Sequence, residues 1–227
     1  MKREIIPKGE LAVTNSIAKQ INDEVLSSAL PAEIVKKVNE LLSKIEDREQ
    51  LSLHSILSKD ALQFIYRNRS EILFTGEGVR EHVLWRYFSD QIAENPVSED
   101  FLESLLQEYK ATKYIGLESV VVSALKSDLL TEMQVLKVSG RISTHVVQKE
   151  CYAFQIRKKI QLGQSLTEKE IAILLDNRLY STIELAFDKQ SISSDGLMLL
   201  MKPYDGEQDK KLRRKLSLLA QRLIKDN

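Results

Sequence analysis

The sequence predicts an all-α protein built from helix–turn–helix units that stack against one another. Three observations lead to this prediction. Apolar residues recur at helical spacing along most of the chain. Only 8 glycines and 4 prolines occur in 227 residues, which argues against an all-β sandwich with many tight turns. A short N-capping pattern recurs five times after residue 56, each time before a helix-like run.

The first fifty residues predict an N-terminal helical hairpin. The first helix has Asn15 as its expected N-cap, and its apolar face consists of Ile17, Ile21, Val25 and Ala29. Pro31 marks a break, after which a second helix carries the apolar stripe Ile34, Val35, Val38, Leu41, Leu42 and Ile45. We therefore expect residues 1–50 to form a hairpin domain and residues 51–227 to form a separate helical-repeat domain.

The repeated pattern is an aliphatic residue, then Ser or Thr, then a helical run. It occurs at Leu57-Ser58, Val97-Ser98, Leu130-Thr131, Leu166-Thr167 and Ile192-Ser193. A Ser or Thr at the N-cap accepts a hydrogen bond from the first helical turn. The aliphatic residue before the cap can contact another one four positions after the cap, and the matching residues are Leu62, Leu102, Val135, Ile171 and Leu197. Gln134 and Glu170 also complete two capping boxes.

A second helix is predicted after each of these starts, over residues 79–88, 117–125, 145–154, 180–187 and 212–223. A single helix–turn–helix unit cannot bury its apolar face alone, so neighbouring units must stack. We expect a short α-solenoid or a compact helical array. A non-repetitive helical bundle is the alternative, because capping boxes occur in any helical protein.

Two segments carry a resemblance to known repeat families. They are residues 166–175, Leu-Thr-Glu-Lys-Glu-Ile-Ala-Ile-Leu-Leu, and residues 130–135, Leu-Thr-Glu-Met-Gln-Val. Together with the other units, they make residues 57–227 similar to HEAT-like and leucine-rich-variant α-helical repeats. The Pro, Asp and Arg that are typical of the turns of HEAT units are not found at the corresponding positions. The resemblance implies a scaffold that presents an extended surface to a partner, and it implies no chemistry.

The charge balance and the single cysteine limit the class of protein. Lys plus Arg and Asp plus Glu number 33 each, which excludes a basic field over the whole molecule but not a local basic patch. No apolar stretch has the length of a signal peptide or a membrane span. Cys151 has no second cysteine with which to form an internal disulfide. We therefore expect a cytoplasmic protein without an integral membrane segment.

The candidates for chemistry all have simpler interpretations. The Gly-containing segment 75–79 is interpreted as a turn before a helix rather than a phosphate-binding loop. His54, His82 and His145 lack metal-ligand spacing. Cys151 follows His145 by six residues, which places the two side chains on different helical faces. We predict no catalytic residue, no metal and no cofactor.

The C-terminal helix gives the main functional indication. Its apolar stripe is Leu212, Leu216, Leu219 and Leu223, and the candidate contacts for an anionic partner are Lys211, Arg214, Lys215 and Arg222. A terminal capping helix with a polar outer face is the competing, favoured interpretation. A second basic cluster at residues 157–159, Arg-Lys-Lys, joins these cations in one strip if the repeats stack regularly.

Three hypotheses about function follow. The first is a non-catalytic scaffold that binds a protein partner through the helical-repeat surface. The second is a protein that binds a nucleic-acid phosphate backbone through the basic strip, in which case added salt weakens binding steeply. An enzyme ranks last, because no set of residues combines suitable types with suitable spacing. Self-association through the N-terminal hairpin is compatible with all three.

Overall fold

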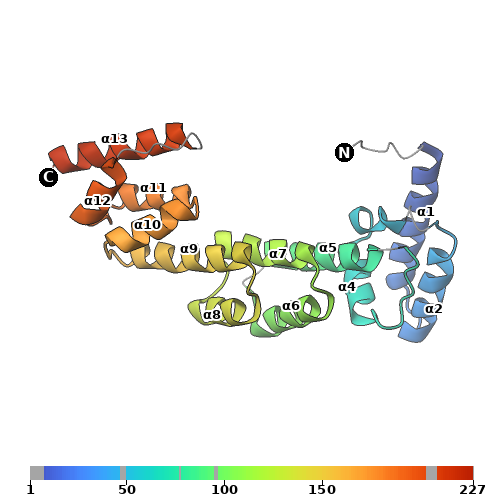
Figure 1. Cartoon of the computed structure of the whole chain (residues 1–227). Helices are drawn as coiled ribbons and strands as arrows, with labels where there is room; N and C mark the ends of the chain where they lie inside the picture. Colours follow the sequence, from blue (N-terminus) through green and yellow to red (C-terminus); the bar gives the residue numbers. More distant parts are fainter. Residues whose placement is uncertain (1–7, 47–49, 77, 95–96, 203–208, 227) are drawn as a thin grey trace. The chain divides into compact units, whose positions relative to one another are not determined.

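The computed structural model describes residues 8–46, 50–76, 78–94, 97–202 and 209–226 (Figure 1). Regular secondary structure within these residues is helical, and the described chain contains no β-strand apart from an isolated parallel bridge between Leu166 and Ile192. The all-α prediction is confirmed. The chain divides into two compact units, Met1–Ala124 and Leu125–Asn227.

The helices follow one another in chain order, as labelled in Figure 1. The first unit contains α1 (Lys8–Val25), α2 (Pro31–Leu42), η1 (Leu53–Ser55), α4 (Lys59–Arg67), α5 (Val79–Glu94), α6 (Glu99–Thr112) and most of α7 (Ile115–Lys126). The second unit contains α8 (Glu132–Arg141), α9 (His145–Gln161), α10 (Glu168–Asp176), α11 (Tyr180–Asp188), α12 (Ser194–Met201) and α13 (Lys210–Asp226).

The N-terminal hairpin is present as the packed pair α1 and α2. The expected N-cap at Asn15 is wrong, because the helix already runs from Lys8 and Asn15 lies inside it. α2 begins at Pro31 as expected, with proline at a first-turn position where its fixed φ suits a helix.

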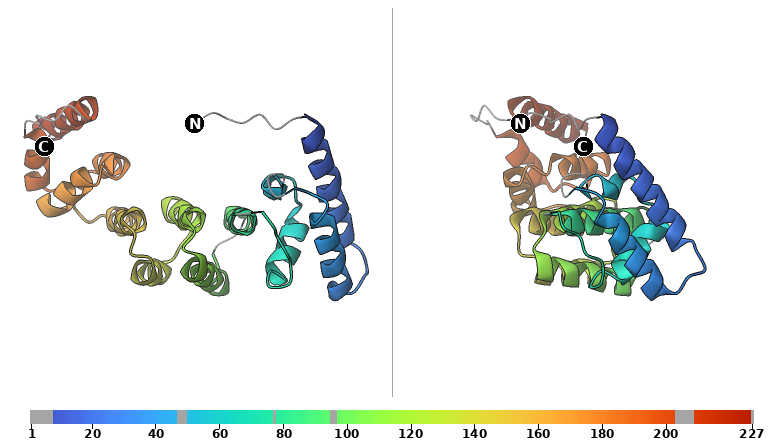
Figure 2. Two further views of the ribbon diagram at one scale, coloured as in Figure 1. Left: turned by 45° about the vertical axis from the view of Figure 1, so that its right-hand side comes forward. Right: turned by 90° about the vertical axis from the view of Figure 1, so that its right-hand side faces the viewer.

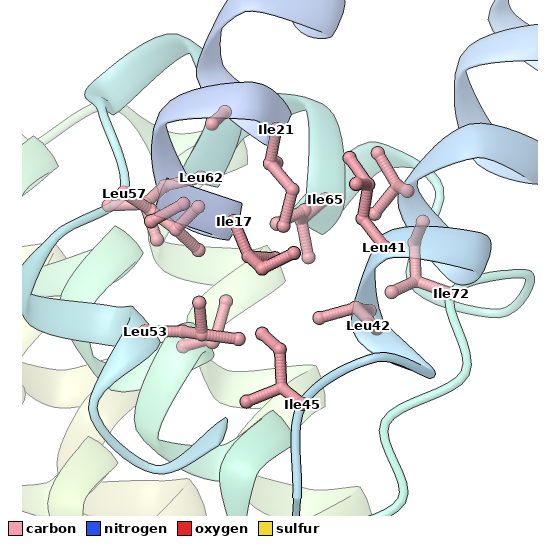
Figure 3. Close-up of a cluster of buried hydrophobic side chains, with 14 of the residues drawn as sticks. Ile17, Ile21, Leu41, Leu42, Ile45, Leu53, Leu57, Leu62, Ile65 and Ile72 are labelled. Atoms are coloured by element: carbon pink, nitrogen blue, oxygen red, sulfur yellow. The ribbon is translucent and has the colours of Figure 1, made fainter. Parts of the chain in front are cut away.

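The hairpin shares its core with the segment that follows it (Figure 3). Ile17 and Ile21 of α1 pack in one apolar cluster with Leu53 of η1 and Ile65 of α4. The buried side-chain amide of Gln50 adds a polar link, because it donates to the carbonyl of Leu42 at 3.2 Å and to the hydroxyl of Thr75 at 2.7 Å. Residues on the two sides of the expected boundary at residue 50 thus share one apolar cluster within the compact unit Met1–Ala124.

All five predicted N-caps form. Each cap hydroxyl accepts a backbone hydrogen bond from the third residue of its helix at 3.2 or 3.3 Å, and the cap residues are Ser58, Ser98, Thr131, Thr167 and Ser193. Both predicted capping boxes, with Gln134 and Glu170, are complete. The aliphatic residues on either side of the caps are buried, and the most exposed are Val97 and Ile192 at 8 %. A local signal thus places the start of α4, α6, α8, α10 and α12.

The five predicted second helices are also present, as α5, α7, α9, α11 and α13. Packing joins the two helices within the pairs α4–α5, α8–α9, α10–α11 and α12–α13. The hydroxyl of Tyr109 on α6 donates to the carboxylate of Glu118 on α7 at 2.7 Å, which links the remaining pair. The helical array is confirmed, and the regular curvature of a solenoid stays a prediction.

Neighbouring helix starts are hydrogen-bonded to each other in the second unit. The backbone N–H of Leu166 donates to the carbonyl of Ser191 at 2.8 Å, and the N–H of Ser193 donates to the carbonyl of Leu166 at 2.9 Å. These bonds hold the starts of α10 and α12 side by side, and the two helices pack against each other (Figure 2). Gly196 permits this approach, because a Cβ there would lie 3.2 Å from Ile171 and 3.0 Å from Ile192.

Candidate interaction surface

The C-terminal helix α13 is held on the second unit by its apolar side. Leu216 and Ala220 are fully buried in the core cluster formed by residues 153–220, and Leu219 and Leu223 pack partly against it. Leu212, the first residue of the expected stripe, is half-buried. The docking of this stripe fixes which side of α13 faces outward.

The four predicted partner-binding residues are all exposed on α13, and they are Lys211, Arg214, Lys215 and Arg222. Their spacing of three, four and eleven positions from the first cation places them on one face of a helix with about 3.6 residues per turn. The name "basic face" is used below for these four residues. The structure therefore brings together the residues that the sequence selected.

Only one member of the basic face has an acidic partner within the described residues. The Lys215 ammonium lies 2.6 Å from the Glu184 carboxylate, which joins α13 to α11. Lys211, Arg214 and Arg222 form no ion pair in that part of the chain. An exposed pair such as Lys215–Glu184 contributes little to stability, because water and salt screen it.

The first turn of α13 needs compensation, because cations at a helix N-terminus oppose the helix dipole. Asp209, the residue before the helix, supplies a negative charge next to Lys210 and Lys211. Its carboxylate accepts a hydrogen bond from the Tyr180 hydroxyl at 3.0 Å and lies 3.5 Å from the Arg178 guanidinium. Burial, together with Asp209, raises the pKa of Tyr180. Asp205 and Glu207 also precede this helix in the sequence, and they lie outside the described residues.

The second predicted basic cluster lies near the end of α9. Arg157 pairs with Asp128 at 3.1 Å, and Lys159 lies 2.7 Å from Glu170, the acid of the α10 capping box. Lys158 lies over the Phe154 ring, 5.2 Å from its centroid. Two of the three cations are therefore paired with acids of their own unit, and a strip that joins this cluster to the basic face stays a prediction.

A groove of about 330 Å³ is lined by residues of α8, α9 and the segment that follows α9. Its apolar wall includes Leu136, which is 57 % exposed, and Leu162, which is 72 % exposed, while Lys158 lines it with a positive charge. The sequence pattern missed this groove. Its signal lies in α8, where Leu136 falls off the buried stripe made by Val135 and Val138.

The predicted interpretation of Cys151 agrees with its surroundings. The thiol is buried, and burial followed by the nearby charge of Glu150 raises its pKa to about 11. It is therefore a neutral thiol at pH 7 and packs as a small apolar group. Gly78, before α5, has a φ of 75°, which fits the turn predicted there.

Two histidines meet although their spacing gave no reason to expect it. The rings of His54 and His82 stack with centroids 5.3 Å apart, and Trp85 and Tyr114 contact them edge-on. Burial, followed by the charge of His54, lowers the pKa of His82. Among the described residues, no group of three or more His, Cys, Asp or Glu side chains could hold a metal ion.

Comparison with known protein families, with curated proteins and with solved structures finds no match for this chain. Within the residues that the structure describes, no helix has both the length and the apolar character needed to cross a membrane. The basic face and the groove beside α9 both belong to the unit Leu125–Asn227.

Proposed function

We propose that this chain is a non-catalytic scaffold that binds a protein partner, and that its basic face contacts an acidic surface of that partner. The observation that carries the proposal is the division of α13 into two sides. Leu216 and Ala220 fix one side in the core, whereas Lys211, Arg214 and Arg222 are exposed on the other side without an acidic partner among the described residues. A helix fixed in this way is preorganised, so binding has to order the exposed Lys and Arg side chains but not the backbone that presents them.

The surrounding helices support the same proposal. Five helix–turn–helix units with one shared capping pattern fit the resemblance to HEAT-like and leucine-rich-variant repeats, whose arrays present surfaces to partners. The groove beside α9 offers apolar area in the same unit. Exposed cations favour fast and selective association with an acidic partner. The neutral thiol of Cys151 argues against this cysteine as a nucleophile. The proposal places the scaffold in the cytoplasm, where a lone cysteine stays reduced.

Binding to a nucleic-acid phosphate backbone is the second candidate. It is favoured by the composition of α13, whose 17 residues, KKLRRKLSLLAQRLIKD, contain seven cations and one acid. If a nucleic acid is the partner, each phosphate contact lowers the logarithm of the affinity by about 0.9 per tenfold rise in salt. A protein partner gives a weaker salt dependence when apolar contacts contribute. Self-association through the N-terminal hairpin stays a prediction.

The test uses the full chain with Lys211→Glu, Arg214→Glu, Lys215→Glu and Arg222→Glu combined. Tagged wild type and variant are used for affinity capture from native lysate, with and without nuclease. We expect wild type to retain a specific protein in both arms and the variant to lose it, while the circular dichroism of the two chains is the same.

The matched control replaces four other exposed lysines by Glu, so that its net charge equals that of the basic-face variant. These lysines form no ion pair with described residues. These residues are Lys19, Lys36, Lys44 and Lys169. The control should retain the partner. Equal retention by the basic-face variant contradicts the proposed site, and capture of nucleic acid that is released by salt favours the second candidate.

A further inference from the structure

A cavity of about 500 Å³ lies in the second unit, separate from the basic face, where the end of α7, the middle of α9 and the start of α11 meet. Four cationic side chains line it, and they are Lys126 of α7, Lys149 and Arg157 of α9, and Arg178 of the turn before α11. This set is called the cationic pocket below. We propose that the cationic pocket binds the phosphate group of a phosphate monoester.

The charge of the wall favours an anion. Glu150 is the single carboxylate among the described lining residues, and it lies 3.8 Å from the Lys126 ammonium. Asp128 and Asp209 pair with the two arginines from outside the lining. Lys149 has no acidic partner in the described part of the chain, so it leaves a positive charge available to a ligand.

Arg157 is held in a fixed orientation. Its side chain is only 15 % exposed, and its Nε and Nη2 atoms donate to Oδ1 of Asp128 at 3.2 and 3.1 Å. Nη2 also donates to the carbonyl of Leu125. The Nη1 atom donates to no group that the structure describes, so its two N–H bonds remain available. A guanidinium fixed in this manner can donate the N–H bonds of Nη1 to phosphate oxygens, and such charge-assisted bonds are stronger than neutral ones.

The N-terminus of α11 adds a partial positive charge to that of the four cationic side chains. Its N-cap is Leu179, whose aliphatic side chain cannot accept a hydrogen bond from the first turn. Tyr180 and Ser181, the first helical residues, both line the cavity. The partial positive charge at a helix N-terminus therefore has the same sign as the surrounding side chains.

The size and charge of the cavity define the ligand class. Its volume falls within the range of about 300–1,000 Å³ that is usual for small-molecule sites. A phosphate monoester carries about 1.5 to 2 negative charges at pH 7, together with three strong acceptor oxygens. The phosphate belongs either to a free small molecule or to a phosphorylated side chain of a partner protein, and the experiment below separates these sources.

The test titrates the full chain with inorganic phosphate at constant ionic strength and follows the backbone amide resonances of Tyr180 and Ser181 by NMR. Wild type should show saturable shifts below about 10 mM phosphate, the affinity range expected of a few charge-assisted bonds. Lys149→Glu should weaken binding about tenfold or more, and the neutral Lys149→Met should weaken it less. Lys189→Glu is the matched control, because Lys189 is exposed at the other end of α11.

Absence of saturation in wild type overturns the proposal, as does equal phosphate affinity in wild type and Lys149→Glu. A second pair of probes identifies the source. Tighter binding of a blocked Gly-phosphoserine-Gly peptide than of free phosphoserine supports a phosphorylated partner, and the reverse order supports a small molecule. The same peptide without phosphate should not bind, and equal binding of both peptides overturns the proposal. The fourfold basic-face variant should bind phosphate normally, so failure of one proposal is distinguishable from failure of the other.

Discussion

Two basic segments of this chain look alike in sequence and differ in the folded protein. Residues 157–159 near the end of α9 form a run of three cations, and the basic face of α13 consists of four cations. In α9, Arg157 and Lys159 are paired with acids of neighbouring elements. In α13, Lys215 alone of the basic face has an acidic partner among the described residues, and the face stays exposed.

The difference arises from the surroundings of each helix rather than from the cations themselves. Acidic side chains reach α9 from both directions along the chain, with Asp128 before α8 and Glu170 inside α10. The outer side of α13 has only the Glu184 carboxylate of α11 within ion-pair distance among the described residues. Whether a cation is paired in the folded protein therefore depends on the acids of neighbouring elements, and a run of cations in the sequence does not show it.

The largest expected effect tests whether docking by the apolar side fixes the orientation of α13. Leu216→Ala removes a fully buried side chain and should lower the free energy of unfolding by about 2–5 kcal/mol. Leu218→Ala, two positions away on the same helix and 50 % exposed, should change it by less than about 0.5 kcal/mol. Urea unfolding measures both, and similar losses from the two variants would show that α13 does not pack by this side.

The next prediction compares the loss of stability when a paired cation is removed with the loss when an unpaired cation is removed. Arg157→Met removes the partner of Asp128 and a donor to the Leu125 carbonyl, so the free energy of unfolding should fall by about 1.5–3 kcal/mol. Arg214→Met removes an exposed cation and should have an effect below about 0.5 kcal/mol. Urea unfolding of both variants at low salt checks the contrast, which disappears if the Arg157 pair contributes nothing.

The smallest effect concerns pH. Burial acts to raise the pKa of Glu170, but hydrogen bonds from Lys159 and Thr167 and the Lys159 charge outweigh it and lower the pKa below 4.5. A lowered folded-state pKa contributes stability above the unfolded value, and this stability is lost as pH falls through the folded value. Lys159→Met should therefore cost about 1 kcal/mol at pH 7 and less at pH 3.

Thermal unfolding at the two pH values measures this change, with Lys169→Met as the control because Lys169 is an exposed neighbour of Glu170 on the same helix. The control should give the same pH dependence as wild type. A Lys159→Met variant with an unchanged pH dependence would mean that Lys159 does not set the pKa of Glu170.

Local signals account for the parts of the fold that the sequence predicted. The caps at Ser58 and Thr167 depend on residues within five positions of one another, so a short pattern contains all the information. The contact between Gln50 and Thr75, which crosses the expected boundary at residue 50, is not contained in any local pattern. The prediction of an N-cap at Asn15 is wrong for a related reason, since a residue type that favours N-caps can also occur inside a longer helix.

The same distinction between local sequence signals and tertiary contacts applies to the candidate sites. Helical spacing alone placed Lys211 and Arg222 on one exposed face, whereas the pairing of Lys215 with Glu184 required the packing of α11 against α13. The cationic pocket was not predicted, because Lys126 and Arg178 lie on separate elements and are distant in sequence. Residues that converge only through tertiary packing leave no periodic signal.

The backbone bridge at Leu166 also affects how the second unit opens. Its two hydrogen bonds join the chain before α10 to the chain before α12, so neither helix start can unravel without breaking a bond to the other. Local unfolding of these two helices is therefore coupled, and they form one cooperative unit for amide hydrogen exchange. The N–H groups of Leu166 and Ser193 are the reporters of that shared opening.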